Sequence, residues 1–192
     1  MSQNRSTKVH SEKEKRGASS VTDLVHIAVM TSLIAVCSFI TIPMPLGVPV
    51  TLQTFALFFA LEFAGGKCAT VAFLLYTFIG SLGVPVFAGF ASGFGYLLGP
   101  TGGFLTGFVV SCMIFWFFEG RIDKGTLAHY LIIALSMASC YLCGVLWFVY
   151  SGGGVSFVTA LAACVAPFVL PDAVKIVLAV VIARRLSGII KI

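Results

Sequence analysis

The feature that most constrains this chain is its long, unbroken apolar runs, such as FVVSCMIFWFF directly before Glu119. Of its 192 residues, 59% are hydrophobic and only 10% are charged, too few to cover the surface of a soluble domain. Lipid therefore surrounds most of the chain, and lipid offers the backbone no hydrogen bonds. Only helices and closed barrels meet that condition, and barrel strands alternate apolar with polar residues. The continuous runs predict an all-α polytopic membrane protein.

The length of the chain limits its organisation. Because about 20 residues cross the hydrocarbon core, we expect six transmembrane helices and no separate catalytic or nucleotide-binding domain. Residues 1–20 are polar and lack apolar periodicity, which predicts a disordered tail before a single membrane domain over residues 21–192. The predicted spans are 22–42, 51–64, 68–83, 101–119, 127–150, and a sixth that begins between 158 and 167 and ends near 184.

The basic residues predict the orientation of these spans. They precede the first span and occupy the connections after the second, fourth and sixth spans, as Lys67, Lys124 and Arg184 illustrate. With six spans these positions share one side of the membrane, which the positive-inside rule assigns to the cytoplasm. Both termini are then cytoplasmic, including the tail. The net charge of +5 is thereby explained without nucleic-acid binding.

The uncharged connections on the opposite side are rich in Gly, Pro and aromatic residues. They read IPMPLGVPVTLQ over residues 42–53 and GVPVFAGFASGFGYLLGPTGG over residues 83–103. Irregular backbone is tolerated at membrane depth where it lines a cavity or packs on protein. The pattern predicts a ligand pocket toward the outer face, with the first connection as its lid. The alternative is a pair of tight connectors that only pack on the protein.

Three polar residues point to the same pocket. An ionisable residue within a span costs about 2.5–3.5 kcal/mol and so marks a functional site. Pro167 and Pro171 predict a helix start that places Asp172 in the first turn, with Lys175 on the same face. Gln53 opens the second span. The alternatives are a self-contained ion pair and an interhelical hydrogen bond from the glutamine.

Other chemistry is poorly supported by the sequence. Cys140 and Cys143 have redox-motif spacing but no second ligand cluster, so all six cysteines are interpreted as small buried hydrophobes and no metal site is predicted. An intramembrane enzyme would need Asp172 beside His26 or His129. Both histidines begin spans on the cytoplasmic side, across the membrane from Asp172, so no enzyme is predicted.

Four segments carry a resemblance to a known family. They are VPVTLQ (48–53), GVPVFAGFASGFGYLLGPTGGFLTGF (83–108), YLCGVLW (141–147) and APFVLPDAVK (166–175). Together they resemble the BioY family, the biotin-specific substrate-binding component of energy-coupling-factor (ECF) vitamin transporters, from about residue 22 to 185. The resemblance implies six helices, cytoplasmic termini, and a biotin pocket near the outer face of a bacterial cell membrane. It also implies coupling to a transmembrane scaffold subunit and two ATPases.

The resemblance also implies a set of site residues. Asp172 and Lys175 match the polar pair of the pocket, and Gln53 matches the glutamine after the first loop. The glycine-rich wall maps to residues 89–96, and its aromatic side chains suit the apolar rings and thioether of biotin. The predicted substrate-binding residues are Gln53, Phe87, Phe90, Ser92, Gly93, Tyr96, Asp172 and Lys175.

The sequence departs from the family pattern at three places. Pro171 stands where the family usually has glycine, and Ser92 is the polar group of GFASG where many members carry asparagine. Docking on the scaffold uses alanines spaced four apart, and here the pair is Ala28 and Ser32. Small residues at this spacing are common in membrane helices.

The function predicted is high-affinity biotin uptake with biotin as ligand and no cofactor. The chain lacks the phosphate-binding GxxxxGK[ST] loop, so partner ATPases supply the energy, or the chain acts alone as a facilitator. Two further alternatives stay open. One is a component of the same architecture for riboflavin or thiamine, and the other is a structural membrane subunit without a ligand.

Overall fold

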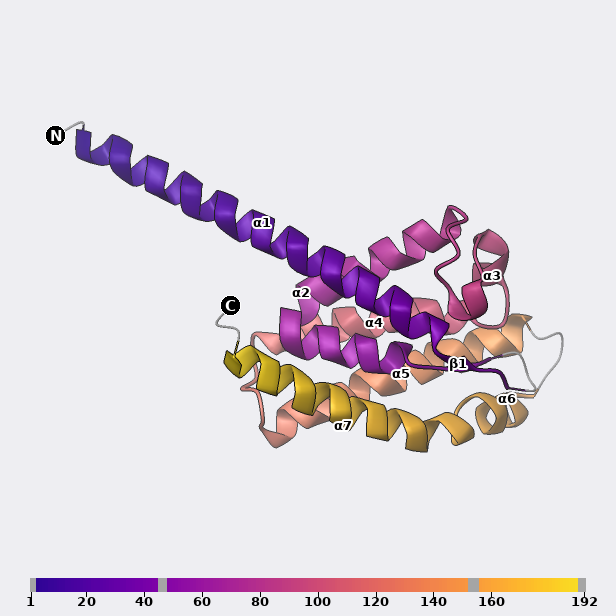
Figure 1. Ribbon diagram of the computed structural model, residues 1–192. Coiled ribbons are helices and arrows are strands. Elements are labelled where there is room, and N and C mark those ends of the chain that lie inside the picture. Colours follow the sequence, from indigo (N-terminus) through magenta and orange to yellow (C-terminus); the bar gives the residue numbers. More distant parts are fainter. Residues whose placement is uncertain (1–2, 45–47, 152–155, 190–192) are drawn as a thin grey trace.

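The computed structural model describes residues 3–44, 48–151 and 156–189, with side chains from residue 21 onward. Long helices form a bundle, and several short elements gather at one end of it (Figure 1). The long helices are α1 (Gln3–Phe39), α2 (Gln53–Ser81), α4 (Gly102–Glu119), α5 (Leu127–Ser151) and α7 (Ala166–Ile189). The short elements are β1 (Thr41–Ile42), β2 (Val50–Thr51), the 3₁₀ helix η1 (Ala88–Phe90), α3 (Phe94–Leu98) and α6 (Phe157–Cys164).

The bundle has two unlike ends. We call the end with β1, η1, α3 and α6 the loop end (Figure 1). The opposite end holds the C-terminal end of α7, and α1 projects beyond the bundle on this side (Figure 1). We call it the turn end, because helix α2 reverses direction there.

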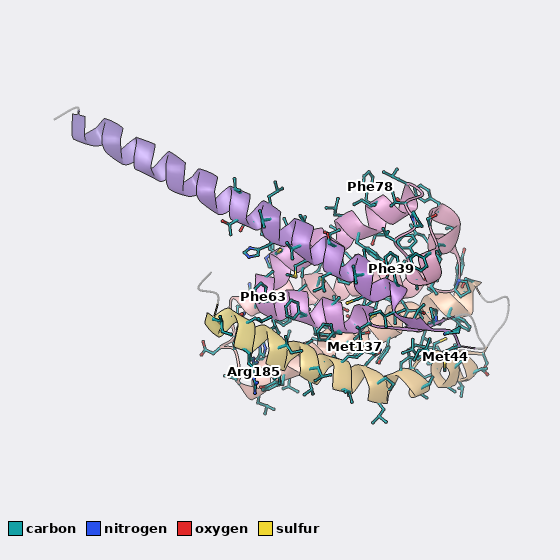
Figure 2. The ribbon with its side chains drawn as sticks, viewed as in Figure 1. Phe39, Met44, Phe63, Phe78, Met137 and Arg185 are labelled. Carbon is teal, nitrogen blue, oxygen red and sulfur yellow. The ribbon has the colours of Figure 1, made fainter. Side chains whose placement is uncertain are left out.

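Helix α2 consists of two segments joined at Gly65. This residue has φ +84° and ψ +162°, a conformation that suits glycine and breaks the helix. Gln53 Nε2 donates to Tyr76 Oη at 2.9 Å. In a straight helix, residues 53 and 76 would lie about 35 Å apart. The two segments are therefore antiparallel. Phe63 of the first segment lies at the turn end, and Phe78 of the second lies at the loop end (Figure 2).

Charged groups from the end of α4 and the following connection cap this reversal. Glu119 Oε2 accepts a hydrogen bond from the Gly66 amide at 2.7 Å, satisfying an unpaired donor at the start of the second segment. Lys124 Nζ donates to the Glu62 carbonyl at 3.1 Å, near the end of the first segment. The sequence predicted two short spans here, and the structure has two helical segments joined by a capped glycine turn.

Five helical stretches of the described residues are long and apolar enough to cross a membrane. They are Val21–Phe39, Gln53–Ser81, Gly102–Glu119, Leu127–Ser151 and Phe157–Ile189. Large apolar side chains on their outer faces are exposed, including Leu24, Leu146 and Leu170. A helical bundle with such a surface is a multi-pass membrane protein, as the composition predicted.

Close approach of α4 and α5 explains part of the glycine-rich segment. A Cβ added at Gly103 would lie 2.2 Å from Trp147 Cβ and 2.8 Å from the Cys143 carbonyl oxygen. Trp147 Nε1 also donates to the Gly99 carbonyl at 2.9 Å. Glycine at position 103 therefore lets α4 lie against α5, and the tryptophan ties α5 to the turn that precedes α4.

One region differs from the expectations. The backbone of residues 3–20 continues α1, whereas a disordered tail was predicted; Glu and Lys, both good helix formers, recur in this segment. The division of the chain into a tail and a membrane domain stays a prediction. The predicted lid loop is held at its base by antiparallel pairing of Thr41 with Thr51. Its residues 45–47 lie outside the described residues, as do residues 152–155.

Candidate ligand-binding site

Two adjoining cavities occupy the loop end. The inner cavity, of about 50 Å³, is lined by residues of α2, α4, α5 and α7, including Gln53, Tyr141 and Asp172. The outer cavity, of about 610 Å³, is lined by the first connection and by the glycine-rich segment. Pro49 and Tyr96 line both cavities. The site is therefore one recess, with a narrow buried part beneath a wide outer part.

Asp172 is the polar centre of the inner part. It is 3% exposed, and both of its carboxylate oxygens have partners on the protein. Lys175 Nζ lies 2.8 Å from Oδ1, and Tyr141 Oη donates to Oδ2 at 2.8 Å. Each oxygen has a further lone pair for an N–H group of a ligand. A buried carboxylate with this geometry is an acceptor site that keeps its charge compensated.

Lys175 lies directly behind this carboxylate. Besides Asp172, its ammonium donates to the Thr51 carbonyl at 2.7 Å, so two of its three N–H groups have described partners. The contact with Thr51 ties α7 to the base of the predicted lid. The pair at positions 172 and 175 shares a helix face as the sequence predicted, and one N–H of the lysine remains available.

The last helix begins within the predicted range, but the predicted place of Asp172 in its first turn was wrong. Helix α7 begins at Ala166 and includes Pro171, so Asp172 lies in its second turn and not its first. Proline at position 171 lacks the amide that would bond to the carbonyl of residue 167, so it interrupts the backbone hydrogen bonding of α7 directly before Asp172. Lys175 and Tyr141, rather than the helix dipole, are therefore the groups that stabilise the carboxylate.

Gln53 is the second predicted polar residue that reaches the inner cavity. It is 5% exposed, donates to Tyr76, and accepts at Oε1 from the Thr51 hydroxyl at 3.1 Å. One N–H of its amide remains for a ligand. The interhelical hydrogen bond considered as an alternative is present, and it aligns the amide with the cavity.

The aromatic residues of the glycine-rich segment divide into two groups. Tyr96 lines both cavities, and burial raises the pKa of its phenol despite hydrogen bonding to Thr101, which keeps the hydroxyl neutral. Phe87 is fully buried behind it, with ring centroids 4.9 Å apart in a stacked arrangement. Phe87 fills the space beside Gly80, where a Cβ would lie 2.2 Å from its ring. Phe87 thus supports the wall.

The remaining predicted wall residues lie outside the two cavities. Phe90 is 65% exposed, has φ +60°, and stacks on Phe39 of α1 at 4.3 Å between ring centroids. Ser92 is exposed, and Gly93 caps the start of α3 with φ +87°. None of these three residues lines either cavity, whereas Gly89 and Gly95 beside them line the outer one. Ligand contacts from Phe90, Ser92 and Gly93 stay predictions.

The predicted docking residues and histidines lie elsewhere. Ala28 and Ser32 are both exposed on α1, and the Ser32 hydroxyl donates to the Ala28 carbonyl at 2.9 Å. His26 contacts Phe63 and His129 contacts Glu62, both toward the turn end. Both histidines are therefore remote from Asp172. Among the described residues no group of three or more His, Cys, Asp or Glu could hold a metal ion.

Sequence reasoning missed two contributors to the polar centre. Tyr141 belongs to the YLCGVLW segment but was assigned no role, and the Thr51 backbone carries no side-chain signal. A signal was present for the tyrosine, because a hydroxyl in the middle of an apolar helix needs a hydrogen-bond partner. Pairing it with Asp172 required the three-dimensional packing of α5 on α7.

These features define the class of protein: a multi-pass helical membrane protein with a recess at its loop end, whose buried part has a polar centre. Comparisons with known proteins then identify the family. The model of the BioY family matches residues 7–191. A probable biotin transporter BioY of Pyrococcus horikoshii is 38% identical over 141 residues, covering 73% of this chain and 82% of that protein. The chain belongs to the BioY family, which confirms the resemblance seen in its motifs.

Further similarities agree with this family. The biotin transporter BioY of Thermotoga maritima is 35% identical over 165 residues, covering 85% of this chain and 95% of that protein. A crystal structure of the S-component for biotin from an ECF-type ABC transporter is similar with a TM-score of 0.79 at 26% identity. That similarity covers 89% of this chain and 93% of the other. The same overall fold therefore occurs in an S-component.

Proposed function

We propose that this chain takes up biotin as the biotin-binding membrane subunit of an ECF-type transporter. The observation that carries the proposal is the buried Asp172 carboxylate, held by Lys175 and Tyr141 at a cavity of a BioY-family chain. Relatives that are 38% and 35% identical are named a probable biotin transporter and a biotin transporter, and a similar structure is that of a biotin S-component. Transport, rather than an enzymatic reaction, is the activity that these similarities support.

The polar centre suits the ureido ring of biotin better than its carboxylate. Asp172 accepts hydrogen bonds from ring N–H groups, and the remaining N–H of Lys175 donates to the ring carbonyl. A carboxylate in the same place would be repelled by Asp172 and would share Lys175 with it. The ureido arrangement brings no like charges together, so the carboxylate of biotin lies toward the loops.

The two cavities supply the room for the rest of the ligand. Small-molecule pockets measure roughly 300–1,000 Å³, so the inner cavity of about 50 Å³ is too small by itself and the outer one of about 610 Å³ is large enough. Biotin would enter through the outer cavity, with Tyr96 against its apolar part. The first connection closes over it as a lid.

The membrane topology proposed is six crossings with both termini in the cytoplasm of a bacterial cell. The antiparallel segments of α2 supply two crossings, and the other four candidate spans supply one each. Arg184 and Lys124 then lie at the cytoplasmic turn end. In a background without native cysteines, a thiol at position 92 should react with an impermeant reagent from outside and one at position 124 should not. The reverse pattern would contradict this topology.

The proposed partners are a transmembrane scaffold subunit and two ATPases, because the chain has no phosphate-binding loop of its own. The small exposed pair Ala28 and Ser32 lets another helix approach α1 closely. A solitary facilitator would need no such contact, and reconstitution with and without the energy-coupling subunits separates the two modes.

Ligand identity is tested with the purified chain. Mass spectrometry of protein purified from biotin-containing medium should find biotin bound, and calorimetry with biotin, riboflavin and thiamine should show saturable binding for biotin alone. Binding of another vitamin in place of biotin would assign a different substrate. No binding of any of the three would favour the structural subunit and contradict the proposal.

A further inference from the structure

A second buried polar cluster lies at the turn end. Glu62 is 3% exposed and His129 is 4% exposed, with Glu62 Oε1 and His129 Nε2 2.5 Å apart. Arg184 Nε lies 3.5 Å from Glu62 Oε2, and its Nη1 donates to Tyr130 Oη at 3.0 Å. We call Glu62, His129 and Arg184 the turn-end cluster. Neither described cavity touches it, so it is not placed to hold a ligand.

The turn-end cluster joins the same three helices as the polar centre of the ligand site. Glu62 lies on α2, His129 on α5 and Arg184 on α7. At the loop end the residues are Thr51 of β2, two residues before α2, then Tyr141 on α5, and Asp172 with Lys175 on α7. His129 to Tyr141 is 12 residues, as is Asp172 to Arg184, which corresponds to about 18 Å along each helix. The three helices are thus tied at both ends.

Burial of the turn-end cluster is costly. The Glu62 side chain is fully inaccessible, and within the described structure neither its Oε2 nor Arg184 Nε has a hydrogen bond. Their 3.5 Å contact is therefore an ion pair and not a hydrogen bond. Well-packed apolar residues in place of a buried ion pair are often neutral or stabilising. A contribution to the stability of the fold therefore does not explain why these three residues are present. Their value must lie in the geometry that they impose.

Directional contacts impose a geometry that apolar packing does not. Apolar contacts are non-directional, and the lipid-embedded face of α7 is apolar, so packing alone sets its position along the helix axis weakly. A slip of α7 by one residue moves its side chains by 1.5 Å. That shift would break the 2.8 Å contact of Asp172 with Tyr141 and the 2.7 Å contact of Lys175 with Thr51.

We propose that the turn-end cluster is a positioning device for the ligand site. Arg184 fixes the axial position of α7 against α5 through its hydrogen bond to Tyr130, and Glu62 ties α5 to α2 through His129 and pairs with Arg184. Together these contacts hold Asp172 opposite Tyr141 at the other end. Glu62, His129 and Arg184 are positioning residues that do not touch the ligand. This inference rests on the proposed function, because it concerns how the biotin site is held.

A double-mutant cycle tests the inference by calorimetric titration of biotin. Tyr141→Phe removes one contact of Asp172, and Arg184→Gln disconnects α7 at the turn end. We expect each change to weaken binding about tenfold. In the Arg184→Gln background, the further loss from Tyr141→Phe should shrink to threefold or less, because α7 is already displaced. Distant, independent sites instead give losses that multiply.

Matched variants separate positioning from folding. Arg185→Gln removes the same charge from the exposed neighbouring position and should leave biotin affinity within twofold. Arg184→Lys, which keeps the charge, should recover part of the affinity. The melting temperature is measured in parallel. If Arg184→Gln cannot be purified folded, Glu62→Gln takes its place in the cycle under the same criterion.

The outcomes distinguish this inference from the function on which it rests. Unchanged affinity in Arg184→Gln, or losses that multiply in the cycle, would overturn the positioning role while the wild-type chain still binds biotin. Absence of biotin binding by the wild-type chain would overturn the proposed function and this inference with it. A lower melting temperature with unchanged affinity would show that the turn-end cluster acts on stability alone.

Discussion

The two ends of the bundle carry polar clusters of similar size on the same three helices, yet they differ in their surroundings. At the loop end, Asp172 has partners on both oxygens and faces a cavity. At the turn end, Glu62 is fully buried, has no adjacent cavity among those described, and leaves Oε2 without a hydrogen bond. The first arrangement can exchange contacts with a ligand, and the second can only hold helices.

The difference shows how a small membrane bundle separates recognition from support. Lipid-facing surfaces contribute no directional contacts, so polar residues must provide both the recognition of the ligand and the support of the helices. Residues that recognise a ligand need spare hydrogen-bonding capacity beside an open space, which Asp172 and Gln53 have, whereas Lys175 lies behind Asp172 and lines neither described cavity. Residues that support need only each other. Burial of a charge is therefore an incomplete guide to a binding site unless a cavity adjoins it.

The largest expected effect comes from neutralising the carboxylate at each end in turn. Asp172→Asn should weaken biotin binding about 100-fold or more, because it leaves Lys175 buried without its counter-charge. Glu62→Gln, the equivalent change at the turn end, should weaken it only about tenfold. Calorimetric titration of both variants checks this. Equal losses would erase the distinction between the two ends.

Packing of α4 offers a second contrast between the ends. Gly103→Ala near the loop end should destabilise the protein by about 1–3 kcal/mol, because the new Cβ overlaps Trp147. Gly120→Ala at the turn end meets nothing within 4 Å and should leave stability within about 0.5 kcal/mol. Thermal unfolding in detergent compares the two. A similar melting temperature for both variants would mean that α4 is free to move away from α5.

A third prediction concerns the exposed face of α1, which belongs to neither cluster. Ala28→Trp should lower ATP-driven biotin transport about tenfold, because a bulky side chain keeps a partner helix away. Biotin affinity of the purified variant should stay within twofold of wild type. Val29→Trp, at an exposed position about 100° around the same helix from Ala28, serves as the control. Loss of affinity in Ala28→Trp would instead place this residue inside the protein.

Much of the fold can be predicted from the sequence because membrane-spanning segments are continuous apolar runs. The runs predicted every long helix to within a few residues at most ends, and GG at positions 65 and 66 marked the reversal of α2. The runs say nothing about short elements such as η1 and α3, whose conformation depends on packing against Gly80 and Trp147. Pro171 was misleading because α7 begins at Ala166 and continues through this proline.

The charged residues of the candidate site were predictable from the sequence. Which aromatic residues line its cavities and which lie behind them was not. Asp172 and Lys175 stand out in an apolar chain, and Gln53 follows a loop of unusual composition. Nothing in the sequence separates Tyr96, which lines the cavities, from Phe87, which supports it from behind. Nor does spacing reveal that Glu62, Arg184 and His129 meet, because they lie on three helices and only packing brings them together.

We propose that the Asp172–Lys175 pair binds the neutral ureido end of biotin. Calorimetry with biotin and with its carboxamide, on the wild-type chain and on Lys175→Ala, tests this assignment. The carboxamide should bind the wild-type chain only a few-fold more weakly than biotin, whereas Lys175→Ala should weaken biotin binding by orders of magnitude. The claim is contradicted if the carboxamide loses as much as Lys175→Ala does and the variant no longer distinguishes the two ligands.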